Sequence, residues 1–315
     1  MNETMGRASW IATAAVMAIL TASVSPNTTA AYPISPVPLR LLCERSDLIV
    51  IARVAGERPV TNEDGWNSTL ADLSVLETLK GPPAEATLSI PYSAGMICPA
   101  PPSYPVGKTL IVFLSRSDED GTLHTLSLSY GTKQLPDETR VVFAQRIREW
   151  VEISREPDSN RRLERTTEWL VQMAEDPVTR WEAVYDFEDH MRPPEAFFGR
   201  REPSVDYWSR IDASQRARLF DLVLEPGPAT YAWWQLVDLF EETSDERLLP
   251  AVVARLRAVT GKTPYFAWSA MRLVAERLGD ERLKTWLKEQ SRSDIQLVFP
   301  AFMAQVGHLG GVPAR

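Results

Sequence analysis

The densest group of side chains that could do acid–base chemistry lies past the middle of the chain, in the run Asp186-Phe187-Glu188-Asp189-His190. Neighbouring carboxylates can act as proton donor and proton acceptor when their surroundings separate their pKa values. No nucleophile, glycine-rich phosphate loop or second histidine lies near this run in the sequence. We therefore interpret it as the solvated end of a helix, where a charged His190 is favourably placed at the helix C-terminus.

The other residue types that bind metals or react covalently are few and scattered. The histidines are His124, His190 and His308, and the cysteines are Cys43 and Cys98. Zinc sites need several ligands, some of them only a few residues apart, so we predict no metal and no cofactor. The sequence also has no phosphate loop, dinucleotide fingerprint, zinc-protease helix or nucleophile elbow. We predict a non-catalytic protein. An enzyme with an unrecognised site is a third hypothesis, after the two binding functions given at the end of this subsection.

The charge of the chain argues against nucleic acid as a partner. The sequence has 34 basic and 42 acidic residues, for a net charge of -8 at pH 7. Such a protein repels phosphate backbones, and no sustained basic stretch offers a compensating surface. With 315 residues, 44% of them hydrophobic, the chain has enough apolar material for two domains with separate cores.

Residues 1–31 have the pattern of a secretory signal. Arg7 precedes an apolar run at residues 10–20, and small residues follow at 29–31. A run of this length is too short for a membrane-spanning helix, which needs about 20 residues. We expect cleavage near Ala30 or Ala31 and a secreted or periplasmic protein with no stable membrane span. The alternatives are an uncleaved anchor helix or a disordered start.

The two cysteines both fall in the first half of the expected mature chain. An isolated pair usually forms a disulfide in an oxidising compartment. A bridge between Cys43 and Cys98 would close a loop of about 55 residues and stabilise the fold by about 4 kcal/mol in the chain-entropy model. The alternative is that both are buried free thiols.

Residues 47–130 alternate short β-rich runs with turn residues. The run at 47–54 is nearly continuous in apolar character, which predicts a strand buried on both faces. The run at 69–79 alternates imperfectly, which predicts a bulge, and Gly81-Pro82-Pro83 ends it because proline cannot continue a β-ladder. Three further strands are predicted at 87–91, 109–114 and 122–129. Five short strands favour a closed or partly closed Greek-key barrel, because closure removes unprotected edges.

Several of these segments also resemble a known family. Cys43 to Val54, Val75 to Gly81, Cys98, and Tyr104 to Leu114 occur in the order seen in bacterial proteins similar to the netrin-like domain of tissue inhibitors of metalloproteinases. The resemblance covers residues 40–131 and implies an OB-type barrel. In those inhibitors an N-terminal cysteine chelates the protease zinc. Cys43 lies about a dozen residues inside the expected mature start, so we apply the resemblance to the fold and not to the inhibitory chemistry.

After Gly131 the hydrophobic period changes from that of a strand to that of a helix. Leu135-Pro136-Asp137-Glu138 begins the first predicted helix. Eight more helices are predicted at 162–174, 177–188, 214–224, 229–242, 246–260, 264–278, 281–290 and 294–306. The predicted fold class is α+β with two domains, a small five-stranded OB-like β-barrel followed by an all-α domain of helical hairpins at 135–307.

Two segments of the helical half repeat with an offset of 35 residues. Tyr231-Ala232-Trp233 aligns with Phe266-Ala267-Trp268, and 244–248 aligns with 279–283. Such a period is typical of stacked helical hairpins, each of which needs a neighbour to bury its apolar face. The pattern resembles HEAT-type repeats, and a non-repetitive helical bundle is the alternative. The aspartates expected as N-caps of the second helices are Asp245 and Asp280.

Two loops with apolar residues are candidates for binding a partner. The proline-rich loop at 95–105 is stiff and would lose little entropy on docking, although it could equally be a connector. The segment at 192–201 is either a docking patch or a cap over the hairpins. Most of the tryptophans beyond residue 149 are interpreted as core. The candidate binding residues are Met96, Ile97, Tyr104, Phe197 and Phe198.

Together, the export signal, the small barrel and the stacked hairpins favour an exported module that binds an unidentified protein or peptide. The second hypothesis is a protease inhibitor that acts through the loops of the barrel. It would work without the chelating N-terminal cysteine of the family that the barrel resembles.

Overall fold

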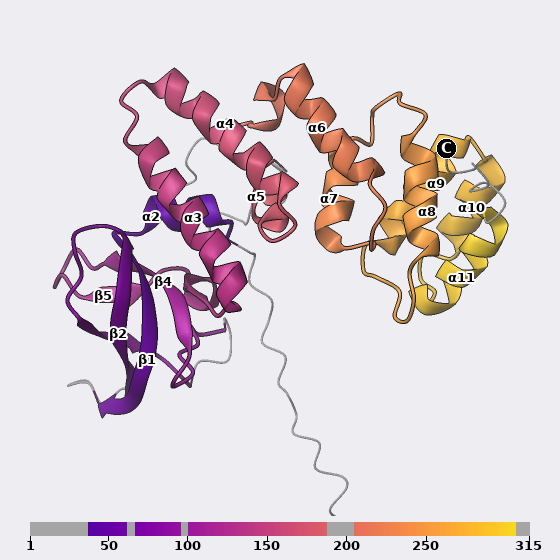
Figure 1. Ribbon diagram of the computed structural model, residues 1–315. Helices are drawn as coiled ribbons and strands as arrows, with labels where there is room; N and C mark the ends of the chain where they lie inside the picture. The colour runs from indigo at the N-terminus through magenta and orange to yellow at the C-terminus, as the bar shows by residue number, and fades with distance from the viewer. Residues whose placement is uncertain (1–36, 62–66, 96–99, 188–204, 307–315) are drawn as a thin grey trace, which may run out of the picture.

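The computed structural model describes residues 37–61, 67–95, 100–187 and 205–306. A β-barrel lies at one end of the molecule, and a series of helices extends away from it (Figure 1). The expected signal, at residues 1–31, lies outside the described residues. No helix within the described ranges is long and apolar enough to cross a membrane.

The barrel is an antiparallel sheet in which five strands pair in the order β3-β2-β1-β4-β5, with β6 paired to β4. Strands β3 and β5, at the two ends of this order, also contact each other, so the barrel is nearly closed. This confirms the predicted barrel, although the fifth strand is shorter than predicted because a 3-10 helix follows at Leu128–Gly131. The strands are β1 (Leu48–Thr61), β2 (Asn67–Lys80), β3 (Thr87–Tyr92), β4 (Thr109–Arg116), β5 (Leu123–Thr125) and β6 (Thr132–Lys133).

Strand β2 contains the predicted irregularity. Its register against β1 shifts three times: two shifts leave Leu79 and Leu76 of β2 without a partner, and the third leaves Ala55 of β1 without one. The strand ends at Gly81, which has a φ of 95°. A Cβ at this position would lie 2.5 Å from the carbonyl oxygen of Asp47, so only glycine fits this turn.

Strands β1 and β4 bury side chains on both faces, as predicted for residues 47–54. Successive residues of a strand point to opposite faces, and here the two faces contribute to two different hydrophobic clusters. One cluster fills the barrel and includes Val50, Ala52, Leu110 and Val112. The other continues into the helices and includes Ile49, Ile111 and Phe113.

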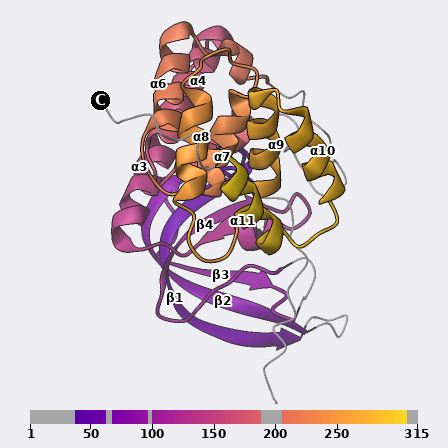
Figure 2. The same ribbon diagram turned by 90° about the vertical axis from the view of Figure 1, so that its right-hand side faces the viewer.

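Every predicted helix is present, with ends that differ by a few residues. The helices stack above the barrel when the molecule is viewed from the C-terminal end (Figure 2). The helices are α2 (Leu39–Arg45), α3 (Asp137–Ser154), α4 (Ser159–Glu175), α5 (Arg180–Phe187), α6 (Ala213–Leu224), α7 (Tyr231–Leu239), α8 (Leu248–Arg257), α9 (Ala267–Leu278), α10 (Glu281–Glu289) and α11 (Ile295–Val306). Helix α2 was not predicted.

Of the two predicted N-caps, Asp280 is confirmed and Asp245 is wrong. Asp280 caps α10 and accepts hydrogen bonds from the backbone amides of Arg282 and Leu283, each at 3.0 Å. Asp245 is not the N-cap of α8, because that helix begins at Leu248, after Arg247. Asp245 instead accepts a hydrogen bond from the Arg247 amide at 2.9 Å and pairs with the guanidinium of the same residue.

A buried ion pair joins α2 to α5 where the barrel meets the helices. Arg40 donates to Asp186 Oδ1 from Nε at 3.1 Å and from Nη2 at 2.9 Å, and it donates to Glu44 at 2.7 Å. Burial alone would lower the pKa of Arg40, but Asp186, Tyr207 and Glu44 together outweigh it and raise that pKa above its ordinary value.

This arrangement corrects the interpretation of Asp186 as part of a solvated helix end. The Asp186 side chain is only 3% exposed, and its partner Arg40 lies 146 residues earlier in the chain. Its second carboxylate oxygen, Oδ2, has no hydrogen-bond partner among the described residues. The rest of that acidic run, 188–190, lies outside the described residues.

Helix α2 is held at both ends by side chains from other elements. Pro38 precedes it and offers no side-chain cap. Glu182 of α5 accepts from the Leu39 amide at 2.8 Å and from Lys133 Nζ at 2.6 Å. At the other end, Lys80 Nζ donates to the carbonyl oxygens of Cys43 at 2.7 Å and Ser46 at 2.5 Å. These contacts satisfy backbone groups that a short helix leaves unpaired.

Cys43 lies within α2 as a buried free thiol. Its expected disulfide partner, Cys98, lies outside the described residues. The structure therefore gives no support to the predicted bridge, and the described position of Cys43 agrees with the alternative of a buried thiol.

We expect the stability of the protein to fall at alkaline pH partly through Cys43. Burial raises the pKa of this thiol far above its ordinary value, so the folded state keeps the proton that the unfolded state loses above pH about 8.5. The stabilisation is complete below that pH and is lost as pH rises, by up to about 1.4 kcal/mol per pH unit. Urea unfolding of wild type and Cys43→Ala between pH 8 and 10.5 should show a difference that shrinks with pH. A constant difference would indicate that Cys43 is not a titratable buried thiol.

Candidate functional site

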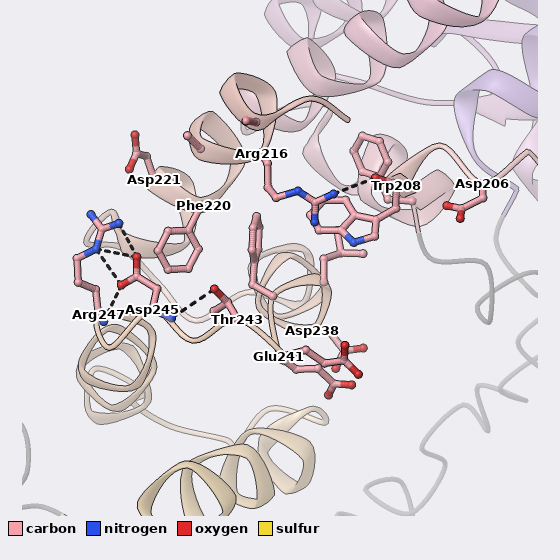
Figure 3. Close-up of a pocket in the computed structure, with 16 residues that line it drawn as sticks. Asp206, Trp208, Arg216, Phe220, Asp221, Asp238, Glu241, Thr243, Asp245 and Arg247 are labelled. Atoms are coloured by element: carbon pink, nitrogen blue, oxygen red, sulfur yellow. Dashed lines mark hydrogen bonds and ion pairs between the residues drawn. The ribbon is translucent and has the colours of Figure 1, made fainter. Parts of the chain in front are cut away.

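A groove of about 830 Å³ lies between α6, the end of α7 and the turn that leads into α8 (Figure 3). Its volume is in the range of protein ligand sites, roughly 300–1,000 Å³. A short 3-10 helix, Trp208–Arg210, forms one side of the groove, and Phe187 at the end of α5 completes it. The groove therefore collects residues from four helices of the helical half and from the turn between α7 and α8.

The sequence at the start of α6 explains how this helix presents its residues to the groove. Asp212 accepts a hydrogen bond from the Gln215 amide at 2.8 Å, and Gln215 Oε1 accepts one from the Asp212 amide at 3.0 Å. This capping box fixes the first turn of the helix. Arg216 and Phe220 follow one turn apart on one face, because residues four apart are neighbours on a helix surface.

One wall of the groove is aromatic. The rings of Trp208 and Phe240 meet edge to face, with centroids 5.2 Å apart and planes at 88°. Phe220 lies 5.0 Å from Phe240, and Phe187 lies 6.0 Å from Trp208. The four rings thus form one continuous cluster from α5 to the end of α7. Phe187, Phe220 and Phe240 are buried, and Trp208 is only partly buried, so Trp208 is the most accessible ring of the cluster.

Two arginines of the protein already lie on these rings. The Arg216 guanidinium is 4.5 Å from the centroid of the Trp208 ring, and the Arg247 guanidinium is 5.3 Å from that of Phe220. Arg247 also pairs with Asp245 at 2.7 Å. Hydrogen bonds from the Arg247 side chain and amide lower the pKa of Asp245 to about 2. The groove is therefore a place where aromatic rings and carboxylates together hold guanidinium groups.

The groove is also strongly acidic. Asp238 and Glu241, near the C-terminal end of α7, direct their carboxylates to the same side of the groove (Figure 3). The negative end of the helix dipole adds to their charge. Six carboxylates and only two guanidinium groups line the groove, an excess of four negative charges. The acidic residues are Asp206, Asp221, Asp238, Glu241, Glu242 and Asp245.

The residue types of the lining are suited to recognising a ligand by stacking and by charge. Histidine, cysteine, serine and lysine do not occur among the described lining residues. Within the described ranges, no group of three or more histidine, cysteine or acidic side chains is arranged to hold a metal ion. Apart from Ala213, Ala217, Leu239 and Thr243, the lining consists of aromatic rings, carboxylates and arginines.

No protein-family model matches this chain, and no curated protein sequence does. The near-closed barrel has the form expected from the resemblance to netrin-like domains. Unrelated families share folds of this kind, so the fold does not identify the family. The resemblance stays a prediction.

Tyr104, the one residue of the predicted binding surface that the structure describes, does not line this groove. Tyr104 is 2% exposed inside the barrel, where its hydroxyl makes a 2.6 Å hydrogen bond with Thr125 Oγ1 and its ring lies 5.2 Å from that of Tyr92. In this conformation its side chain is not on the surface. The other candidates, Met96, Ile97, Phe197 and Phe198, lie outside the described residues.

The sequence contains a signal for the groove, although none of the predictions above rests on it. Five of its six acidic residues fall between 221 and 245, and two of its aromatic residues, Phe220 and Phe240, fall in or beside the same stretch. Such a mixture of acids and aromatics near helix ends could have been proposed as a binding surface. What the sequence could not show is that Trp208, a separate segment, completes it.

Proposed function

We propose that the chain is an exported, non-catalytic module that binds a segment of a partner protein in this groove. The observation that carries the proposal is the aromatic wall beside an open groove of about 830 Å³ at the ends of α6 and α7. A groove of this kind between helices suits an extended or helical peptide. Export is supported by the signal pattern of residues 1–31.

The barrel and the first helices serve as the support of this groove in our proposal. The buried contacts of Arg40 and Glu182 fix α5 against α2. Phe187, the last described residue of α5, lines the groove. One side of the groove is therefore anchored to the barrel through α5.

The second hypothesis, a protease inhibitor, has less support in the described residues. Cys43 matches the early cysteine of the family that the barrel resembles. Here it lies inside α2, and its carbonyl oxygen accepts a hydrogen bond from Lys80 Nζ at 2.7 Å. Its thiol is buried and its carbonyl is engaged, so this residue is not positioned to chelate a protease zinc.

The proposal can be tested by filling the groove. Ala217 is an exposed residue of α6 that lines the groove, and Ala217→Trp would occupy it without touching the core. The matched control is Ala304→Trp on α11, an equally exposed helical position that is not part of the groove lining. The purified protein and both variants would be screened against a displayed library of random peptides.

We expect the library to yield peptides that bind the wild type and the Ala304→Trp variant with equal affinity. The same peptides should bind the Ala217→Trp variant with an affinity at least about tenfold lower. Circular dichroism would check that both variants keep the helical fold. Peptides that bind all three proteins equally, or no enrichment at all, would overturn the proposal.

A further inference from the structure

The groove lining carries a large share of the net negative charge of the chain. The complete sequence carries a net charge of -8, and the residues that line the groove account for an excess of four negative charges. A concave surface lined by one sign of charge attracts ligands of the opposite sign. A basic ligand is favoured, and an acidic one is repelled.

The aromatic wall narrows the choice of basic ligand. Arginine side chains stack on aromatic rings and form paired hydrogen bonds with carboxylates, whereas the ammonium of lysine is a compact, strongly hydrated charge. Within the groove, Arg216 and Arg247 use both modes, one on the Trp208 ring and the other on the Phe220 ring with a pairing to Asp245. The lining thus already combines the two contacts that a further guanidinium would make.

Some carboxylates of the groove lining are exposed, so a ligand can reach them. Asp245 is committed to Arg247. Asp221, on α6, and Glu242, beyond the end of α7, are exposed and come from two different elements of the groove lining. A peptide that follows the groove would meet carboxylates from both of these elements beside the rings.

We propose that the groove binds an arginine-containing segment of a partner protein, with guanidinium groups placed between the aromatic wall and the carboxylates of α6 and the α7–α8 turn. This inference rests on the proposed function and specifies its partner. The groove volume of about 830 Å³ has room for more than one side chain.

The test uses a fluorescein-labelled peptide of alternating glycine and arginine, measured by fluorescence anisotropy with the purified protein. The comparison peptides replace arginine with citrulline, which has a similar shape without the charge, with lysine, or with glutamate. The groove variant is Asp221→Asn with Glu242→Gln, and the matched control is Glu164→Gln with Glu289→Gln. The control pair removes the same charge at exposed helical positions outside the groove lining.

We expect the arginine peptide to bind, to bind more weakly as salt is added, and to bind about tenfold more weakly to the groove variant than to wild type or the control. The citrulline and glutamate peptides should not bind, and the lysine peptide should bind more weakly than the arginine peptide. Equal binding of citrulline, or equal loss in the control variant, would overturn the charge assignment. Equal binding of lysine would overturn the role given to the aromatic wall.

The library screen separates this inference from the proposed function. Groove-dependent peptides that are neutral or acidic would refute the arginine assignment and leave the peptide-binding function in place. Peptides that are basic but bind the groove-filled Ala217→Trp variant normally would refute both.

Discussion

Replacing Arg40 with methionine is expected to lower the free energy of unfolding by about 3–5 kcal/mol, because it leaves a buried carboxylate without its charged partner. Asp186 is 3% exposed, and its Oδ1 accepts both hydrogen bonds from Arg40. Its Oδ2 already has no partner among the described residues, so little compensation is at hand. Urea unfolding followed by circular dichroism at pH 7 would measure the change.

The double variant Arg40→Met with Asp186→Leu tests the cause. Replacing both charges by apolar side chains removes the unpaired carboxylate, and buried ion pairs replaced in this way are often no less stable. We expect the double variant to recover at least half of the loss. The exposed pair Arg155 and Glu152 is the control, where Arg155→Met should change stability by at most about 1 kcal/mol. A double variant as unstable as the single one would contradict the ion-pair explanation.

Replacing Trp233 with alanine is expected to have a similarly large effect, a loss of about 3–5 kcal/mol. Trp233 is fully buried, and its Nε1 donates to the Val223 carbonyl at 3.2 Å. Its ring lies 4.6 Å from the guanidinium of Arg255, whose pKa burial lowers to about 10. Alanine would leave a cavity, an unpaired carbonyl and a less well covered arginine. Chemical denaturation at pH 7 would measure the loss.

Trp268 provides the matched comparison, because the 35-residue offset in the sequence pairs it with Trp233. Its side chain is only partly buried and lines a second groove of about 450 Å³ between α9 and α10. Trp268→Ala should therefore cost less, about 1–2 kcal/mol. Equal losses at both positions would show that sequence equivalence, and not burial, sets their contribution.

Much of the fold could be predicted because it depends on local patterns. The apolar run at 47–54 and the imperfect alternation at 69–79 became strand β1 and the bulged strand β2. The helical period located the nine predicted helices, and Asp280 was found as a cap because its partners are two and three residues away. Local signals of this kind are carried by the sequence itself.

The parts that could not be predicted depend on distant residues. Helix α2 has only seven residues and no capping side chain of its own, and Glu182 and Lys80 stabilise its ends from 143 and 37 residues away. The burial of Asp186 likewise depends on Arg40. The groove forms only when Trp208 comes beside Phe240, and no sequence pattern relates these two residues.

The alternation of side chains along β1 and β4 has a consequence for how the molecule could be divided. Ile49, Ile111 and Phe113 belong to the hydrophobic cluster shared with the helices, although they sit in strands of the barrel. Strands β1 and β4 thus separate two hydrophobic clusters, one inside the barrel and one shared with the helices. A stand-alone barrel excised before residue 135 would expose this apolar face to water and would need polar replacements there to stay soluble.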